Sequence, residues 1–252
     1  MSAAIEIRAL SFRYPDGTSA LTEVTFAVNA GECVGLLGPN GSGKSTLLRH
    51  LNGILPERLP AADGAVRIEG LSVTSANVAT VRRRVGLLFQ DPDDQLFCGT
   101  VSEDIAFGPQ QLGLTPAEVE RRVQAALVQV GLIHLAHRPP HHLSTGEKRR
   151  ACLAGVLACQ PAILVLDEPT SGLDPRGRRE LIALLRSIDA TKLIATHDLE
   201  LVVELCPRSI ILDGGRIIAD GPTATLLNDE PLMLTHGLER PHILHHRHPH
   251  SG

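Results

Sequence analysis

The sequence predicts an α/β fold in which a mainly parallel sheet is interrupted by a helical insertion. Three observations lead to this prediction. Short apolar segments typical of buried strands alternate with helical segments in the second half of the chain, a glycine-rich loop joins a strand to a helix near residue 40, and the stretch 91–160 has helical periodicity. With 252 residues, of which 43% are hydrophobic, the chain can bury a substantial core.

The first third of the chain is predicted to be rich in strands. Alternation of apolar and polar residues over 5–10 and 24–28 indicates two strands, and the apolar run 33–38 indicates a third. A turn at 29–31 separates the last two. Further apolar segments at 65–70 and 85–90 predict two more strands before the helical stretch begins.

Helical periodicity begins after residue 91. A Thr-Pro-x-Glu start at Thr115 precedes Val119, Val123, Ala126, Leu127 and Val130, which are spaced to lie on one face of a helix. Buried-type strands then return at 162–167, 192–196 and 209–215, with helices between them, and a last helix is predicted at 223–229. We therefore expect one domain over 1–230, with a helical subdomain at about 91–160.

The C-terminal stretch 231–252 is predicted to be a histidine-rich tail outside the core. Six of the twelve histidines lie in 236–252, and neutral imidazole is a good ligand for Ni²⁺, Co²⁺, Cu²⁺ or Zn²⁺. Arg247 and Pro249 interrupt the run, which favours a native low-complexity segment over a purification tag. Metal buffering or sensing and a tail without function both stay open, and the tail does not identify a transported ion.

Composition argues against several classes of function. The formal net charge is −4 and aromatic residues make up 2% of the chain, so neither a basic field nor a set of stacking side chains favours nucleic acid as a partner. The five cysteines form no CxxC pair, which suits a reducing cytosol. No segment has the pattern of an export signal or a transmembrane helix.

The segment 38–45 matches G-x-x-x-x-G-K-[ST] and follows a predicted strand directly before a predicted helix. Such a loop points several backbone N–H groups at one anion, with the helix N-terminus behind it. Lys44 is expected to reach the β- and γ-phosphates and Ser45 to hold Mg²⁺. The residues predicted to bind ATP here are Gly38, Pro39, Asn40, Gly41, Ser42, Gly43, Lys44, Ser45 and Thr46.

A second motif ends the apolar strand at 162–168. Asp167 follows the strand at the carboxyl edge of the sheet, where we expect it to reach a Mg²⁺ held by Ser45. Glu168 comes next and is predicted to orient, or take a proton from, a water in line with the γ-phosphate.

The segment Leu143 to Glu147 (LSTGE) resembles the LSGGQ signature of ABC ATPases, and the remaining motifs of that family follow in the right order over residues 14–197. The resemblance implies an ABC-type P-loop NTPase (RecA-like) core with an antiparallel β subdomain and a helical subdomain. It further implies roles for an adenine-stacking tyrosine, a Q-loop glutamine that contributes to catalysis and binds Mg²⁺, signature residues, a D-loop aspartate and a catalytic switch histidine. In the same order, the corresponding residues are Tyr14, Gln90, the signature pair Ser144 and Gly146, Asp174 and His197.

In this family ATP is held between two chains arranged head to tail, so the resemblance implies a homodimer or a heterodimer with a second ATPase. Ser144 and Gly146 of one chain would then meet the phosphates bound by Lys44 of the other. The signature departs from the family pattern at Thr145, whose side chain we expect to crowd the γ-phosphate if the backbone there needs glycine. It also departs at Glu147, which we expect to point away from the anion.

Two segments, 89–97 (FQDPDDQLF) and 104–114 (DIAFGPQQLGL), resemble the ATPases of energy-coupling-factor importers, in particular the cobalt and nickel subgroup. The resemblance implies a peripheral subunit on the cytoplasmic face of the cell membrane. Its partners would be an integral-membrane T component, whose coupling helices dock in a groove, and a membrane subunit that binds the substrate. A vitamin importer of the same type stays open.

Other classes of protein fit the sequence less well. A soluble ABC ATPase acting on nucleic acid or ribosomes would need a long coiled coil, for which the roughly 100 residues between Lys44 and Ser144 leave no room, or tandem domains or basic patches. A kinase or GTPase does not explain the LSTGE segment. A metal chaperone or storage protein would depend on the histidine tail alone.

Overall fold

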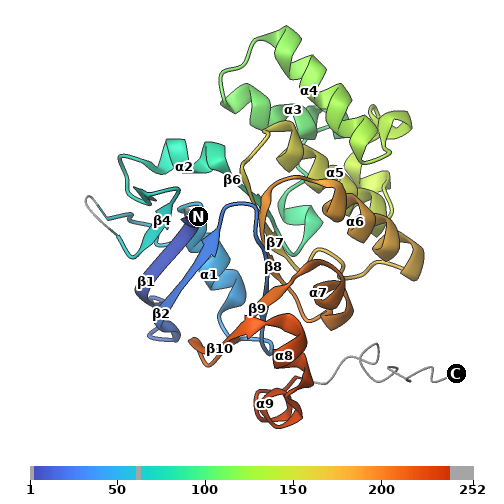
Figure 1. Cartoon of the computed structure of the whole chain (residues 1–252). Coiled ribbons are helices and arrows are strands. Elements are labelled where there is room, and N and C mark those ends of the chain that lie inside the picture. The colour runs from blue at the N-terminus through green and yellow to red at the C-terminus, as the bar shows by residue number, and fades with distance from the viewer. Residues whose placement is uncertain (1–2, 61–63, 239–252) are drawn as a thin grey trace, which may run out of the picture.

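The larger of two sheets carries most of the predicted motifs. The structure is a computed structural model that describes residues 3–60 and 64–238 (Figure 1). This sheet has the order β10-β9-β3-β8-β7-β6, and all neighbours pair in parallel except β10, which is antiparallel to β9. Its strands are β3 (Cys33–Leu37), β6 (Val85–Leu88), β7 (Ile163–Asp167), β8 (Thr191–Ala195), β9 (Arg208–Asp213) and β10 (Arg216–Pro222).

The parallel register brings the ends of the central strands together. Leu36 of β3 lies opposite Ala195 of β8, and Ala195 in turn lies opposite Asp167 of β7. The loops that follow these strands therefore emerge at one edge of the sheet, which is where ligands bind in open parallel sheets.

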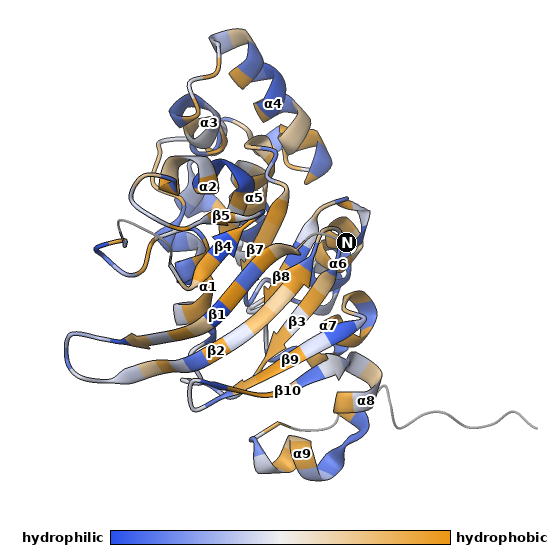
Figure 2. Ribbon diagram, turned by 60° about the vertical axis from the view of Figure 1, so that its left-hand side comes forward, coloured by the Kyte–Doolittle hydropathy of each residue, from blue (hydrophilic) through white to orange (hydrophobic). Residues whose placement is uncertain are grey.

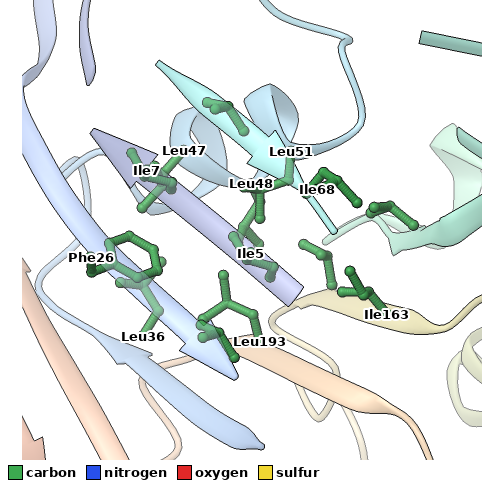
Figure 3. Close-up of a cluster of buried hydrophobic side chains, with 14 of the residues drawn as sticks. Ile5, Ile7, Phe26, Leu36, Leu47, Leu48, Leu51, Ile68, Ile163 and Leu193 are labelled. Carbon is green, nitrogen blue, oxygen red and sulfur yellow. The ribbon is translucent and has the colours of Figure 1, made fainter. Parts of the chain in front are cut away.

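The second sheet is antiparallel and is built mostly from the first third of the chain. Its order is β2-β1-β4-β5, with β1 (Ala3–Arg13), β2 (Ser19–Asn29), β4 (Val66–Ile68) and β5 (Leu71–Ser72). Its apolar face packs with α1 (Lys44–Leu51) and one face of the large sheet. Figure 3 shows Ile5, Leu48 and Leu193 meeting in this core.

The other face of the large sheet is covered by helices from the second half of the chain. Here α5 (Thr145–Ala158), α6 (Pro175–Ser187) and α7 (Leu199–Leu205) bury Leu153, Leu181 and Leu201 against β7 and its neighbours. Figure 2 shows hydrophobic residues concentrated on strands such as β7 and β9.

Helices α3 (Val101–Gln111) and α4 (Pro116–Gln129) join α5 in a third core at one end of the molecule (Figure 1). Thr115 caps α4 by accepting a hydrogen bond from the Glu118 N–H at 3.4 Å, as its Thr-Pro-x-Glu start predicts. Val119, Val123 and Leu127 are buried on the face that the sequence pattern predicts. The predicted α/β fold of the P-loop NTPase type is confirmed.

Several elements differ from the sequence expectation. Helix α2 (Val78–Arg84) and strand β10 are not indicated by the sequence pattern, because α2 buries only Val81 and β10 is half-exposed along its length. Among the residues that the structure describes, no helix has the length and apolar character needed to cross a bilayer.

The packed part of the chain also extends beyond residue 230, where the sequence analysis expected the domain to end. Helices α8 (Thr223–Asn228) and α9 (Glu230–Thr235) pack on the large sheet, and Met233 and Leu238 are buried in its core. The packed part of the chain thus continues past 230, because these apolar residues cover the sheet edge. The remaining histidine-rich stretch, 239–252, lies outside the described residues.

Candidate nucleotide-binding and catalytic site

The glycine-rich loop between β3 and α1 has a backbone that needs glycine. Gly43 has a φ of 105°, and a Cβ there would lie 2.5 Å from the Ala20 carbonyl oxygen. A larger residue would therefore strain the backbone and collide with β2. Lys44 begins α1, and its Nζ donates to the Gly38 and Pro39 carbonyl oxygens at 2.7 and 2.9 Å.

A cavity of about 460 Å³ lies over this loop. The structure brings residues from four of the predicted motifs to its wall, although they are far apart in the sequence. The lining includes residues 40–46 together with Tyr14, Thr18, Gln90, Asp167 and Glu168. Among the described parts of the chain, this is the place where the phosphate loop, the strand-end acids and the expected adenine-stacking tyrosine meet.

Tyr14 reaches the cavity from the loop after β1. Its hydroxyl shares a hydrogen bond of 2.8 Å with Thr46 Oγ1 in the first turn of α1, and the Phe12 ring contacts it edge-on with centroids 5.0 Å apart. Tyr14 is thereby attached to the same helix that carries the phosphate loop. An aromatic ring at this wall is suited to stack on a base.

Asp167 at the end of β7 is buried, and its Oδ1 has no hydrogen-bond partner among the described residues. Burial raises the pKa of this carboxyl, whereas the Ser45 hydroxyl and the charge of Lys44 act to lower it. The unpartnered carboxylate oxygen of Asp167, the Ser45 hydroxyl and the Gln90 amide line one cavity and together supply hard oxygen donors. Asp167, Ser45 and Gln90 therefore fit a Mg²⁺ ion.

Glu168 follows Asp167 with a φ of 47° and is held by the segment after β8. Its Oε2 accepts a hydrogen bond from Thr196 Oγ1 at 3.0 Å, and its Oε1 accepts one from the His197 N–H at 3.1 Å. His197 Nδ1 lies 2.9 Å from Glu168 Oε2, with 66% of the imidazole side chain exposed. Two of the three residues predicted to be catalytic, Glu168 and His197, thus form a contacting pair.

The signature residues line a different cavity, of about 450 Å³. Ser144 caps α5 and Asp174 caps α6, where Asp174 Oδ1 accepts a hydrogen bond from the Gly177 N–H at 2.7 Å. Gly146, Gly172 and Arg176 also line this cavity, and no residue of the 38–46 segment does. Within one chain, the phosphate loop and the signature therefore line two separate cavities.

The Glu147 side chain, which we expected to point away from the anion, contacts the signature serine. Its carboxylate turns back on the signature serine, and Ser144 Oγ donates to Glu147 Oε2 at 2.8 Å. The reason is local: a Ser followed three residues later by Glu at a helix start forms a capping box. Thr145 is exposed in the first turn of α5.

Arg149 is a residue of this region that the sequence analysis missed. It is buried in α5 and donates to three carbonyl oxygens, those of Phe89 at 3.2 Å, Gln90 at 2.7 Å and Ser171 at 3.1 Å. The guanidinium thus ties the signature helix to the chain at Gln90 and to the segment before Asp174. The available signal was a pair of arginines, Arg149 and Arg150, immediately before the apolar run from Ala151.

Asp198, next to His197, has a similar attachment. Both of its carboxylate oxygens accept hydrogen bonds from Arg178 of α6, at 2.7 and 2.8 Å, and Thr170 Oγ1 donates a third at 2.9 Å. Such a bidentate pair fixes orientation as well as distance. The helix after Asp174 is therefore connected to the segment that holds His197.

The fold and the arrangement of these residues define a P-loop ATPase whose signature segment lines a separate cavity. Residues 21–171 match the family model described as ABC transporter, and the chain belongs to this family. It is an ATP-binding protein and an ATP hydrolase of the ABC type.

Known relatives support the same assignment. The chain is 56% identical over 239 residues to a putative ABC transporter ATP-binding protein of Streptomyces coelicolor, covering 95% of this chain and 90% of that protein. It is 46% identical to the energy-coupling factor transporter ATP-binding protein EcfA of Carboxydothermus hydrogenoformans, covering 96% and 88%.

Two solved structures show the fold. The cbiO1 structure from Clostridium perfringens, part of the ABC transporter complex cbiONQ, superposes with a TM-score of 0.79 at 35% identity and covers 97% of this chain and 98% of that one. A dimeric post-hydrolysis state of the ATP-binding cassette MJ0796, bound to ADP and Pi, gives a TM-score of 0.76 at 25% identity, with 87% and 98% covered. Across these relatives, the chain resembles ATPases of the energy-coupling-factor type.

Proposed function

We propose that the chain is the ATPase subunit of an energy-coupling-factor importer on the cytoplasmic face of the membrane, and that the importer carries cobalt or nickel ions. An exposed apolar groove beside the nucleotide site is the observation that carries this proposal. The similarity of the chain to EcfA and to cbiO1 also supports the proposal. The choice of a metal ion over a vitamin depends on the cbiO1 likeness.

The active form in this proposal is a head-to-tail dimer. The cavity over the phosphate loop and the cavity beside Ser144 belong to different parts of the chain surface. A second copy, or a second ATPase, would place its Ser144 and Gly146 over the nucleotide bound at Lys44. Asp174 lies in the same half-site as Ser144 and would face the partner's nucleotide as well.

Each residue then has a distinct task during hydrolysis. Tyr14 stacks on adenine, residues 38–46 bind the phosphates, and Lys44 moves its Nζ from loop carbonyls to the β- and γ-phosphates. Mg²⁺, which Ser45, Gln90 and Asp167 would hold, neutralises phosphate charge when bound. Glu168 accepts a proton from the attacking water, and His197 orients the Glu168 carboxylate and contacts the γ-phosphate.

The groove lies between β6, the segment after it and the helices α3 and α5. It is a cavity of about 220 Å³ whose wall includes Phe97, Phe107, Gln95 and Asp104. Phe97 is 65% exposed and Phe107 is 42% exposed, and the centroids of their rings, which meet edge-on, lie 4.9 Å apart. Two exposed aromatic rings at a concave surface are suited to anchor an apolar helix of a membrane partner.

Asp104 adds a polar requirement to this surface. Its Oδ1 accepts hydrogen bonds from the Phe97 and Cys98 N–H groups, both at 2.9 Å, which holds the Phe97 loop in place. Its Oδ2 is buried without a partner among the described residues. The position of the Phe97 ring in the groove wall therefore depends on the buried Asp104 carboxylate.

Hydrogen bonds connect the groove to the nucleotide site. Gln95, in the groove wall, accepts from the Phe89 N–H at 3.2 Å and donates to the Cys152 carbonyl at 3.3 Å. Arg149, three residues before Cys152, donates to the Gln90 carbonyl. Movement of a docked helix would therefore be transmitted through these hydrogen bonds to Gln90.

The test changes Phe97 and Phe107 to Ser in the full chain. Leu96 is not suited to this test, since it is half-buried against two cores. We expect the variant to bind ATP normally but to lose pull-down of the membrane subunits and uptake of radioactive Co²⁺ and Ni²⁺ by cells. Ile133→Ser, at a side chain 49% exposed elsewhere on the helical subdomain, is the matched control.

Full uptake and pull-down by the double variant would contradict the proposed docking groove. Uptake of a vitamin, with no uptake of either metal ion, would overturn the metal assignment and keep the importer. A truncation that removes residues 240–252 should leave pull-down intact.

A further inference from the structure

Glu147 forms an unusual contact for a half-site that has to receive an anion. The Ser144 N–H and the Ser144 hydroxyl both donate to Glu147 Oε2 at 2.8 Å, and the Glu147 N–H donates back to Ser144 Oγ at 3.3 Å. A serine hydroxyl has one proton to donate. In the single chain, that proton is already used by a carboxylate.

The Glu147 carboxylate is ionised, and nearby positive charges neutralise it only weakly. The hydrogen bonds from Ser144 are the main cause that lowers the pKa of Glu147, and the charges of Arg138 and Arg150 act in the same direction. Among the described residues, no Lys, Arg or His nitrogen forms an ion pair with Glu147. Arg150, the nearer candidate in sequence, pairs with Glu180 at 3.2 Å. A net negative charge therefore lies at the Ser144 hydroxyl.

This inference rests on the head-to-tail dimer of the proposed function. In that dimer the γ-phosphate held by one chain needs the Ser144 hydroxyl proton of the other. Phosphate and the Glu147 carboxylate are both anions, so they compete for one donor and repel each other. We infer that Glu147 opposes closure of the ATP-bound dimer, and that closure requires its carboxylate to leave Ser144.

The structure contains a place for the released carboxylate. Arg150 lies three residues after Glu147 on α5, the spacing at which side chains on a helix meet. Arg150 also lines the signature cavity together with Glu147 and Glu180. Transfer of Glu147 from Ser144 toward Arg150 would free the hydroxyl and move negative charge away from the phosphate.

The experiment compares Glu147→Gln with the unchanged residue in a Glu168→Gln background, which keeps ATP intact. Glutamine can still accept the Ser144 N–H bond, so the helix cap is preserved while the charge is removed. We expect Mg-ATP to drive dimerisation at a protein concentration lower by about tenfold, a difference of about 1.4 kcal/mol. Sedimentation velocity over a concentration series measures it.

Glu103→Gln is the matched control. Glu103 forms the same capping box on α3, where its Oε2 accepts from the Thr100 N–H at 2.9 Å, and it lies outside the signature cavity. The same loss of charge there should leave the dimerisation concentration unchanged. The advantage of Glu147→Gln should also shrink between about 50 and about 500 mM NaCl, since salt screens charge repulsion.

The same dimerisation concentration with and without the Glu147→Gln change would overturn the inference and leave the dimer of the proposed function in place. An advantage that is the same at low and high salt would also overturn it, because repulsion between charges would not be the cause. Absence of any ATP-dependent dimer in all variants, at saturating Mg-ATP, would overturn the proposed dimer itself and the inference with it.

Discussion

His197 Nδ1 lies 2.9 Å from Glu168 Oε2, although 29 positions separate the two residues in the chain. Glu168 is buried directly after β7, and His197 is exposed after the neighbouring strand β8. The pair thus joins a carboxylate inside the nucleotide cavity to a ring at its surface. Its geometry suits a base that is oriented by a second residue.

Removal of the Glu168 charge should separate binding from hydrolysis. We expect Glu168→Gln to bind ATP with unchanged affinity, because the phosphate loop is untouched and the amide oxygen can still accept the hydrogen bond that Thr196 donates to Oε2. Hydrolysis should fall by about two to four orders of magnitude, the usual contribution of a general base. Steady-state phosphate release and equilibrium ATP binding measure the two effects, and a rate near that of the unchanged protein would contradict the role of Glu168.

His197→Ala should lower hydrolysis as well, and its effect should not add to that of Glu168→Gln. Two residues that act as one unit give non-additive effects when both are changed. We therefore expect the double variant to hydrolyse ATP no more slowly than Glu168→Gln alone. Multiplicative losses in the double variant would show that the 2.9 Å contact has no part in catalysis.

Lys44→Ala should weaken ATP binding itself. In the proposed function, the Lys44 Nζ group leaves the Gly38 and Pro39 carbonyl oxygens and forms charge-assisted hydrogen bonds with the phosphates, which are stronger than neutral ones. We expect a loss of affinity of at least about tenfold in equilibrium dialysis. Lys148→Ala, which removes the ion pair with Asp93 at 2.6 Å, is the control and should bind ATP normally.

Arg149→Met should destabilise the fold more than any surface arginine does. Its removal takes a buried guanidinium out of α5 and leaves the partly buried carbonyl groups of Phe89, Gln90 and Ser171 without this donor. We expect the free energy of unfolding to fall by roughly 2–4 kcal/mol. Urea unfolding followed by circular dichroism measures it, because the chain has no Trp. Exposed Arg179→Met should change stability by less than about 0.5 kcal/mol.

His50 should make stability depend on pH. Burial lowers the pKa of this imidazole from 6.5, although its hydrogen bond with the Thr46 carbonyl acts in the other direction. Well above pH 6.5, His50 is neutral in both the folded and the unfolded chain, so it does not make the free energy of unfolding depend on pH. Below it, the unfolded chain takes up a proton that the folded chain binds more weakly, so stability falls as the pH falls.

His50→Gln removes this dependence. Between about pH 7.5 and about pH 5.5, we expect the unfolding free energy of the variant to decrease less than that of the unchanged chain, as measured by urea titrations at each pH. Parallel curves for the two proteins would show that the His50 pKa is not lowered in the folded state.

Much of the fold and site was predictable because the relevant signals are local. The loop at 38–45, the strand that ends at Asp167 and the apolar stripe of α4 each lie within one short segment. Periodicity and glycine positions determine such segments directly. Helix α9 was not predicted, because Met233 is buried only by contact with core residues that are distant in the sequence. Strand β10 was not predicted, because it is half-exposed along its length and has no apolar run.

By itself, the sequence determined which chemical groups the protein has and their order: a phosphate loop, strand-end acids, a signature and a histidine after a strand. Only the tertiary structure decided which of them meet. It brings Glu168 to His197 but leaves Ser144 in a separate cavity, and it buries Arg149 between Gln90 and Ser171. The physical reason is that local backbone preferences act over a few residues, whereas contacts between distant side chains are set by strand register and helix packing.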